Sequence, residues 1–225
     1  MSLQNKKTLN AYQKAANQYL VNNIKQDTKE VEKANKELHE FIKSSFSSIN
    51  KGSKILEIGS ADGENAKYIQ SLGYDVVASD VADDFIKTIK TKDIKTIKFN
   101  VLEDVFQEKY SGIFCWKVFV HFTDKDILNV LEKTYNALEE NGILVFNVIS
   151  RETKNVKEEW IDFPGEYSIG IDRYFRYFYK EEIDKLIKQS KYKLVTFKEE
   201  FGIEKQKWLV YVLKKGSEQN RSKYK

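Results

Sequence analysis

The chain has 225 residues with 38 basic and 34 acidic side chains, and 41% of its residues are hydrophobic. This length and hydrophobic content favour one folded domain with its own core and exclude a wholly disordered chain. One cysteine, Cys115, and two histidines exclude a disulfide framework, a cysteine-built zinc site and a multi-histidine metal site, so we expect no metal.

The net charge of +4 is concentrated at the C-terminus. Residues 214–225 carry five basic groups and one acidic group, which leaves 33 of each in the rest of the chain. A neutral body argues against nucleic acid as a partner. The N-terminus lacks the apolar core of a signal peptide, and no apolar run approaches the roughly 20 residues that cross a bilayer. We therefore expect a cytoplasmic monomer or homodimer that does not bind membranes.

The first fifty residues predict a helical cap. Apolar side chains recur at helical spacing between Tyr12 and Leu20 and again between Val31 and Ile42, with no proline among them. The polar stretch 50–53 then marks a boundary.

From residue 54 the pattern alternates between strands and helices. Short strands are predicted at 54–58, 74–79, 96–99, 112–118 and 143–149, with helices at 64–72 and 83–90 and a longer one that Asp124 is expected to cap. This alternation is typical of a parallel sheet covered on both faces.

The segment 150–180 breaks this alternation. It holds the only proline, Pro164, among many aromatic residues, and we interpret it as an insertion on the substrate side that partly covers a sheet edge. A helix at 181–189 and two strands at 193–200 and 207–213 follow; their short connection requires the strands to be antiparallel. Residues 51–214 thus form the main domain, and 215–225 a disordered tail.

The most informative loop is the one after the first strand, in the sequence ILEIGSADG (55–63). Small residues between a strand and a helix let a ligand approach the backbone. The G-x-x-x-G spacing of Gly59 and Gly63 differs from the G-x-G-x-x-G fingerprint of dinucleotide sites. By itself this spacing is also what an ordinary turn in an α/β fold shows. A carboxylate would suit this helix end better than a pyrophosphate.

Two further strand ends carry polar groups. Asp80 ends the second strand, where its carboxylate suits a ribose diol. Asn100 follows the third strand and offers an amide oxygen to an exocyclic amine, and Val101 offers a flat apolar contact to a purine.

With these segments in order, the chain resembles the class I S-adenosylmethionine-dependent methyltransferases of the small-molecule type. The resemblance covers about residues 10–214. It rests on LEIGSADG (56–63), VVASDVADDFI (76–86), FNVLED (99–104), the segment 121–149 that holds the long helix and fifth strand, and the closing helix and strand pair. AYQKAANQYL (11–20) is similar to a Y-x-x-x-A-x-x-Y segment that often caps the cofactor in that family.

The resemblance implies a fold, a cofactor and a set of binding residues. The fold is α/β and Rossmann-like: a doubly wound, mostly parallel seven-stranded sheet with helices on both faces, a C-terminal antiparallel strand pair and N-terminal helices. The cofactor is S-adenosyl-L-methionine. This chain departs from the family at Ala61, where a glycine is usual, and at Asn100, where an acid is usual. The cofactor-binding residues implied are Glu57, Gly59, Ser60, Ala61, Gly63, Asp80, Val81, Asn100, Val101 and Tyr19.

The acceptor side is less defined by the sequence. His121 follows the fourth strand and is the candidate general base, or alternatively a locally hydrogen-bonded loop residue. Trp116 and Lys117 precede it as candidate substrate contacts, although Trp116 suits a buried core as well. Arg173 and Arg176 suit a carboxylate or phosphate, or are solvated surface charges.

The N-terminal tyrosines have two interpretations. Tyr12, a further candidate substrate contact, and Tyr19 shield the sulfonium if their helix folds over the site; otherwise they form a packing stripe. The function predicted is methyl transfer to a small-molecule acceptor. The alternatives are a nicotinamide-dependent oxidoreductase, which the missing dinucleotide fingerprint disfavours, and a non-catalytic cofactor-binding protein.

Overall fold

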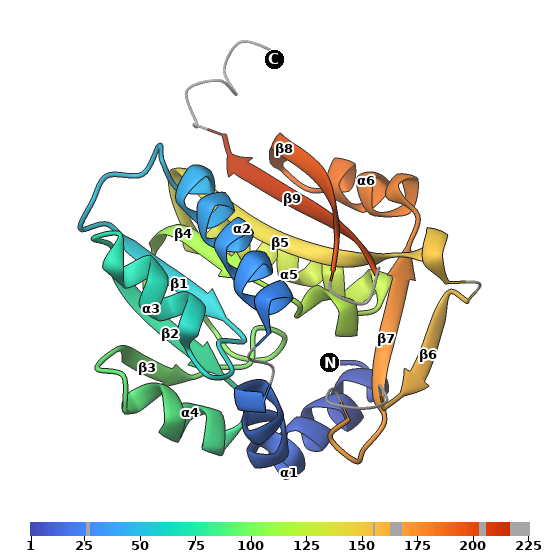
Figure 1. Ribbon diagram of the computed structural model, residues 1–225. Helices are drawn as coiled ribbons and strands as arrows, with labels where there is room; N and C mark the ends of the chain where they lie inside the picture. The colour runs from blue at the N-terminus through green and yellow to red at the C-terminus, as the bar shows by residue number, and fades with distance from the viewer. Residues whose placement is uncertain (26–27, 155, 163–167, 203–205, 217–225) are drawn as a thin grey trace.

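The computed structural model describes residues 1–25, 28–154, 156–162, 168–202 and 206–216. Its elements follow one another along the chain as shown in Figure 1. The helices are α1 (Leu3–Lys25), α2 (Lys29–Ser45), α3 (Glu64–Ser71), α4 (Asp83–Lys90), α5 (Asp124–Ala137) and α6 (Lys180–Gln189), with short 3₁₀ turns η1 (Phe119–His121) and η2 (Arg151–Thr153). The strands are β1 (Lys54–Ile58), β2 (Asp75–Asp80), β3 (Lys95–Lys98), β4 (Tyr110–Cys115), β5 (Leu138–Ser150), β6 (Glu158–Ile161), β7 (Arg173–Phe178), β8 (Tyr192–Phe201) and β9 (Lys207–Lys215).

The central sheet confirms the predicted architecture. Strands β3, β2, β1, β4 and β5 lie side by side and parallel, and β9 and β8 continue the sheet antiparallel from β5. These seven strands are the mostly parallel sheet with a C-terminal antiparallel pair that the sequence predicts. Helices α2 and α3 pack on one face and α5 and α6 on the other (Figure 1). Doubly wound sheets place ligands at the carboxyl ends of their parallel strands.

Segment 150–180 is built differently from the predicted insertion. Its described part contributes two more strands to the sheet. β7 pairs in parallel with the last two residues of β5, and β6 pairs antiparallel with β7. Every residue of β7 is buried, because one face packs against α1 and η1 and the other supports α6. The segment therefore extends the sheet; Pro164 lies outside the described residues.

Three predicted boundaries are wrong for local reasons. Thr123, not Asp124, caps α5, because its side chain accepts from the Asp126 N–H while Asp126 accepts in return, a capping box. β4 ends at Cys115 rather than at 118, since Lys117 adopts a left-handed backbone conformation with φ of 59°. β5 begins at Leu138 and runs through Asn141 and Gly142, where a turn was expected. The predicted disordered tail, 215–225, is wrong at its start, because Lys215 belongs to β9; residues 217–225 lie outside the described residues.

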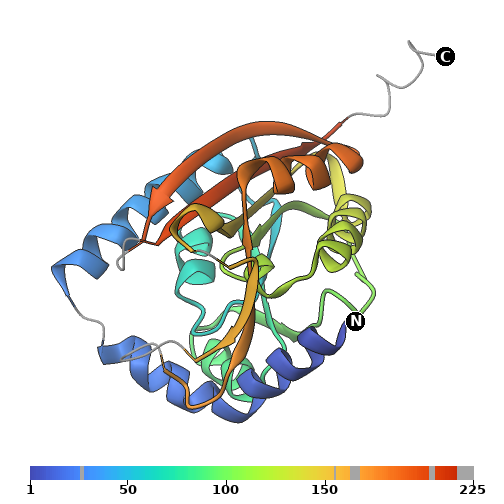
Figure 2. The same cartoon turned by 90° about the vertical axis from the view of Figure 1, so that its right-hand side faces the viewer.

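The N-terminal helix α1 covers a sheet end rather than a sheet face. In Figure 1 it lies at the lower edge of the molecule, between α4 and the lower end of β7, and it contacts both elements. In Figure 2, α1 and α2 lie apart, and they approach the sheet from different sides. Within the described residues, no helix is both long and apolar enough to cross a bilayer.

Candidate functional site

A cavity of about 520 Å³ opens at the carboxyl ends of the central strands, beneath α1 and α2. It gathers side chains that are far apart in the sequence, from Asn5 to Trp208. Most of the predicted site residues line it: Gly59, Ser60, Ala61, Asp80, Val81, Asn100, Val101, Tyr12, Tyr19, Trp116, Lys117, His121 and Arg173. The structure thus brings together the strand ends that the sequence singled out.

The loop after β1 is held against the end of β2. The N–H groups of Gly59 and Ser60 both donate to the Ser79 carbonyl, at 2.9 Å each, and the Ser79 hydroxyl donates to the Glu57 carbonyl at 2.7 Å. Gly59 has φ of 77°, and a Cβ placed there would meet the Val118 Cγ2 at 2.4 Å. Only glycine therefore fits this turn, which leaves the backbone open to the cavity.

Asp80 ties two loops together. Its carboxylate accepts from the backbone N–H of Ala61 at 2.9 Å, of Val81 at 2.7 Å and of Ala82 at 3.2 Å. Burial raises the pKa of Asp80, while the three N–H groups act in the opposite direction. The sequence predicted the position of this carboxylate at the cavity; its role in shaping both loops was not predicted.

Asn100 begins a turn after β3. Its amide oxygen accepts from the Leu102 N–H at 3.1 Å, and its own N–H donates to the Asp104 carboxylate at 2.7 Å. The amide oxygen that was expected to face a ligand therefore also holds the turn. Val101 beside it is buried at the cavity wall.

Helix α1 brings aromatic rings over this end of the cavity. Tyr12 and Tyr19 stack edge to face with centroids 6.2 Å apart, and both contact the ring of Phe85 from α4. Ala16 of α1 and Ala61 of the loop pack into the same cluster. The tyrosines thus form a packing stripe with Phe85 and also line the cavity, while their contact with a sulfonium stays a prediction.

His121 lies in a hydrogen-bonded chain. Its Nδ1 is 2.7 Å from the Tyr174 carbonyl oxygen, so Nδ1 carries the proton and Nε2 accepts from the Tyr12 hydroxyl at 3.0 Å. The Arg173 guanidinium lies over the Tyr12 ring at 5.5 Å and forms an ion pair with Asp162. Burial lowers the pKa of His121 to about 4, which keeps the imidazole neutral at neutral pH.

The other end of the cavity holds side chains from β4, β5 and β9. Lys117 faces the cavity, and its Nζ lies 5.7 Å from the centroid of the Trp208 ring. The Lys117 N–H donates to the Asn147 amide oxygen at 2.6 Å. Lys117 keeps exposed surface, and desolvation by the surrounding protein atoms lowers its pKa.

Three lining residues at this end were missed by the sequence analysis. Asn147 is the one polar residue in the apolar stretch 143–149 of β5, and this pattern could have identified it. Gln206 and Trp208 follow the turn between β8 and β9, where nothing in the sequence pattern points to a cavity.

Three predicted site residues do not line the cavity. Glu57 lies buried under the loop, where burial raises its pKa to about 8. Gly63 acts as the N-cap of α3, with φ of 80°. Arg176 points to the opposite face of β7 from Arg173 and pairs with Asp124 and Glu182. Arg176 is therefore a structural residue, and the expectation that it contacts the acceptor is corrected.

The residues that line the cavity form two groups, one at each end. The loop compartment is lined by Gly59, Ser60, Ala61, Asp80, Val81, Asn100 and Val101. The sheet compartment is lined by Lys117, Asn147, Ile149, Gln206 and Trp208. His121 and Tyr12 also line the cavity and come from η1 and α1.

Comparison with known proteins supports a relationship over most of the chain. Residues 30–196 match the family model described as a methyltransferase domain. No curated protein sequence matches this chain. The match begins at α2, so α1 with Tyr12 and Tyr19 lies outside it.

Solved structures share the fold at low identity. An S-adenosylmethionine-dependent methyltransferase from Methanosarcina mazei superposes with a TM-score of 0.66 at 14% identity, covering 76% of this chain and 95% of that one. One from Clostridium acetobutylicum gives 0.65 at 13%, covering 86% and 95%. The magnesium protoporphyrin IX methyltransferase from Synechocystis, with bound S-adenosylmethionine, gives 0.63 at 9%, covering 84% and 83%.

Proposed function

Because this chain belongs to the methyltransferase domain family, we propose that it transfers a methyl group from S-adenosylmethionine to a small-molecule acceptor. One observation carries the proposal: Gly59 and Asp80, the two residues on which the sequence argument depended most, line the same cavity at the carboxyl ends of adjacent strands. A nicotinamide-dependent enzyme remains only as an outcome of the test, since no observation favours it.

The loop compartment fits the cofactor in its chemistry. Backbone exposed at Gly59 suits the methionine part, the Asp80 carboxylate suits ribose hydroxyls, and the apolar side chains of Val81 and Val101 suit an adenine ring. Ala61 lies in the left-handed region, with φ of 46°. The loop therefore keeps the backbone conformation that a glycine favours, which is compatible with a cofactor lying against it.

When bound, S-adenosylmethionine supplies a methyl group already activated by its sulfonium, so the protein has to align the acceptor and exclude water. The rings of Tyr12, Tyr19 and Phe85 line the cavity from α1 and α4, where they would exclude water from the reacting atoms. Aromatic faces also tolerate a neighbouring cation. Tyr12 and Tyr19 of α1 lie outside the matched residues 30–196, in the segment that resembles the family's Y-x-x-x-A-x-x-Y cap.

His121 is the proposed proton acceptor for an acceptor group that reacts with its proton attached. Its Nδ1–H is fixed by the Tyr174 carbonyl, so the lone pair on Nε2 is directed to the Tyr12 hydroxyl at the cavity. A pKa of about 4 keeps this lone pair available across the physiological range. Tyr12 must move or relay the proton for His121 to act, since its hydroxyl occupies Nε2.

The acceptor is proposed to be small. The cavity of about 520 Å³ is shared with the cofactor, and the covering helices α1 and α2 both line it. Equal numbers of basic and acidic groups in residues 1–213 argue against nucleic acid as the acceptor.

Calorimetry with S-adenosylmethionine and its demethylated product tests the proposal directly. We expect both to bind the full chain in the micromolar range and NADH not to bind. Release of demethylated cofactor during incubation with a panel of metabolites would then establish turnover. Absence of binding by either compound at high micromolar concentration, or tighter binding of NADH, would overturn the proposal; binding without turnover on every acceptor would leave a non-catalytic cofactor-binding protein.

A further inference from the structure

The sheet compartment contains hydrogen-bond donors that have no acceptor. The Asn147 Nδ2 is buried and has no hydrogen-bond partner among the described residues, and the same is true of the Gln206 Nε2. A buried donor without a partner costs roughly 1–3 kcal/mol, so native proteins rarely keep one without a reason. Two such donors on one cavity point to a ligand that supplies acceptors.

A hydrogen bond to the amide oxygen fixes the orientation of the Asn147 side chain. The Asn147 amide oxygen accepts from the Lys117 N–H at 2.6 Å, so the NH₂ group has to be the part left without a partner. Asn147 has no exposed surface, and its neighbours on the same face of β5, Val145 and Ile149, offer no acceptor. Because Asn147 is one of the residues that line the cavity, its unpaired donor lies in the cavity wall and not at the outer surface.

Lys117 adds a cation to the same compartment. It forms no ion pair with any described residue, and the nearest ring to its Nζ is that of Trp208. Its backbone is left-handed, with φ of 59°, two residues after the end of β4. Desolvation lowers its pKa, and a bound anion would act against that shift.

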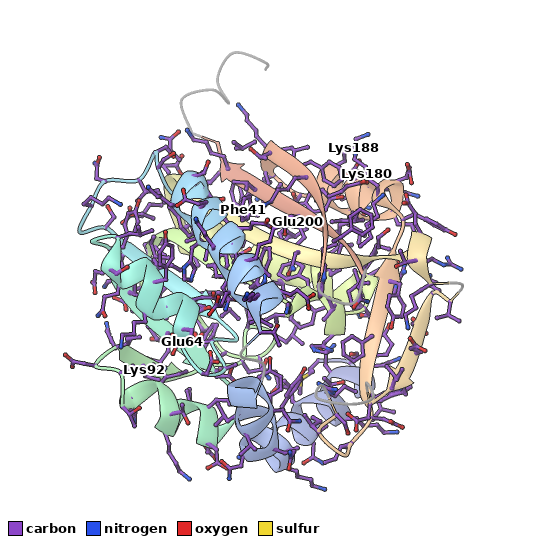
Figure 3. All side chains as sticks on the ribbon, in the orientation of Figure 1. Phe41, Glu64, Lys92, Lys180, Lys188 and Glu200 are labelled. Atoms are coloured by element: carbon purple, nitrogen blue, oxygen red, sulfur yellow. The ribbon has the colours of Figure 1, made fainter. Side chains whose placement is uncertain are left out.

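The acidic groups around the cavity already have partners. Glu200 on β8, labelled in Figure 3 together with Phe41 of α2, pairs with Lys198, and the Lys198 Nζ lies over the Phe41 ring. Glu64 pairs with Lys92, also labelled in Figure 3, and Glu37 pairs with Lys33 on the exposed side of α2. Asp62 and Asp80 belong to the loop compartment side. Glu200, which lies opposite Trp208 in the β8–β9 pairing, is thus the carboxylate at this end of the cavity, and it pairs with Lys198 and not with Lys117 among the described residues.

We infer that the sheet compartment binds a carboxylate of the methyl acceptor, held by Lys117, Asn147 and Gln206, with the acceptor's apolar body against Trp208 and Ile149. This inference rests on the proposed function and adds the substrate class, an organic acid. A planar carboxylate carries a negative charge and has lone pairs that accept from several donors at once. A neutral amide lacks this charge. The carboxylate is an anchor, and the methylated atom is elsewhere on the molecule.

The test uses the full chain saturated with demethylated cofactor and three acid–amide pairs of similar shape: benzoate with benzamide, phenylacetate with phenylacetamide, and indole-3-acetate with indole-3-acetamide. Binding is followed by ligand-observed NMR and by tryptophan fluorescence. We expect at least one acid to bind ten-fold or more tightly than its amide. Acids that bind no better than their amides, or no acid binding at all, would overturn the inference.

Substitution of Lys117 locates the effect. Lys117→Met should weaken the acid ten-fold or more and leave amide and cofactor binding within two-fold, while Lys117→Arg keeps part of the acid affinity. Lys67→Met, on the exposed side of α3, removes an equal charge far from the cavity and should change nothing. An unchanged acid affinity in Lys117→Met would contradict the assignment. Failure of the cofactor itself to bind would instead contradict the proposed function, so the two failures are distinguishable.

Discussion

The loop compartment and the sheet compartment are built by different means. The loop compartment uses residues 59–101, a continuous part of the chain, and its shape is held by backbone N–H groups that donate to Ser79 and Asp80. The sheet compartment uses side chains from the loop after β4, from β5 and from around the start of β9, about ninety positions apart in sequence at their extremes. Because backbone groups are the same in every sequence, the first kind of site tolerates sequence change, whereas the second changes its chemistry with each side chain.

We expect the largest effect from a substitution at Gly59, where the loop compartment has the least space for a side chain. Gly59→Ala combines a left-handed backbone with a Cβ that would meet Val118 at 2.4 Å, so we expect loss of cofactor binding and a fall of about 4 kcal/mol in the free energy of unfolding. Gly52→Ala is the matched control, because Gly52 has φ of 80° and open space around it. It should cost about 1–2 kcal/mol. Equal losses in urea denaturation would show that the contact with Val118 does not matter.

Asp80→Asn tests the link between the two loops. The substitution replaces an oxygen that accepts backbone N–H groups by an NH₂ group that repels them, and we expect cofactor affinity to fall about 100-fold in calorimetry. Asp83→Asn, three residues later on the exposed surface of α4, is the control and should stay within two-fold. A small effect of Asp80→Asn would mean that the backbone turns hold without the carboxylate.

The pH dependence of stability tests the other side of the cavity. Burial lowers the folded-state pKa of His121 from 6.5 to about 4, so the unfolded chain binds more protons between these values. Stability from this group is therefore complete above pH 6.5 and is lost as the pH falls, by about 2 kcal/mol between pH 6.5 and pH 4.5.

Comparison with a variant isolates this contribution. We expect the loss of stability between pH 6.5 and pH 4.5, measured by urea denaturation, to be about 2 kcal/mol smaller in His121→Gln than in the wild type. His39→Gln should keep most of the wild-type loss, because His39 is only half-buried where it stacks on Tyr68. A His121→Gln profile that runs parallel to the wild-type profile would show that the buried imidazole does not titrate in this window.

The smallest expected effect concerns Ala61. Its φ of 46° lies in the left-handed region, where a Cβ is disfavoured, so Ala61→Gly should stabilise the fold by about 0.5–1 kcal/mol in thermal or urea unfolding. Cofactor affinity should change less than three-fold, since the Ala61 N–H still donates to Asp80. Asn141→Gly, at φ of 63°, should give less because asparagine tolerates this region. A loss of stability in Ala61→Gly would show that the methyl group's packing against α1 outweighs backbone strain.

Much of the fold and of the loop compartment was predictable from local signals. The strand at 54–58 and the helix at 83–90 were predicted at their observed bounds, because apolar periodicity and flanking polar residues mark them clearly. Gly59, Asp80 and Asn100 were found because each follows a strand, and parallel strands end at one edge.

The sheet compartment was predictable only in part. Lys117 was named as a candidate contact, but its place beside Asn147 and Trp208 depends on the antiparallel return of β9 along β5. The paired arginines show the same limit: Arg173 and Arg176 are three positions apart on a strand, so they point to opposite faces, and the strand itself was predicted as an irregular insertion.

The sequence by itself determined the alternating architecture, the positions of the strand ends and the residues that shape the first loop, because these depend on short-range periodicity and on backbone conformation. Only the tertiary structure decided that Arg176 is buried between Asp124 and Glu182, that His121 is bonded to Tyr12, and that Asn147 faces a cavity with its NH₂ group unpaired. Those facts depend on which distant elements meet, and a side chain's charge and hydrogen-bonding partners are set by that meeting and not by its neighbours along the chain.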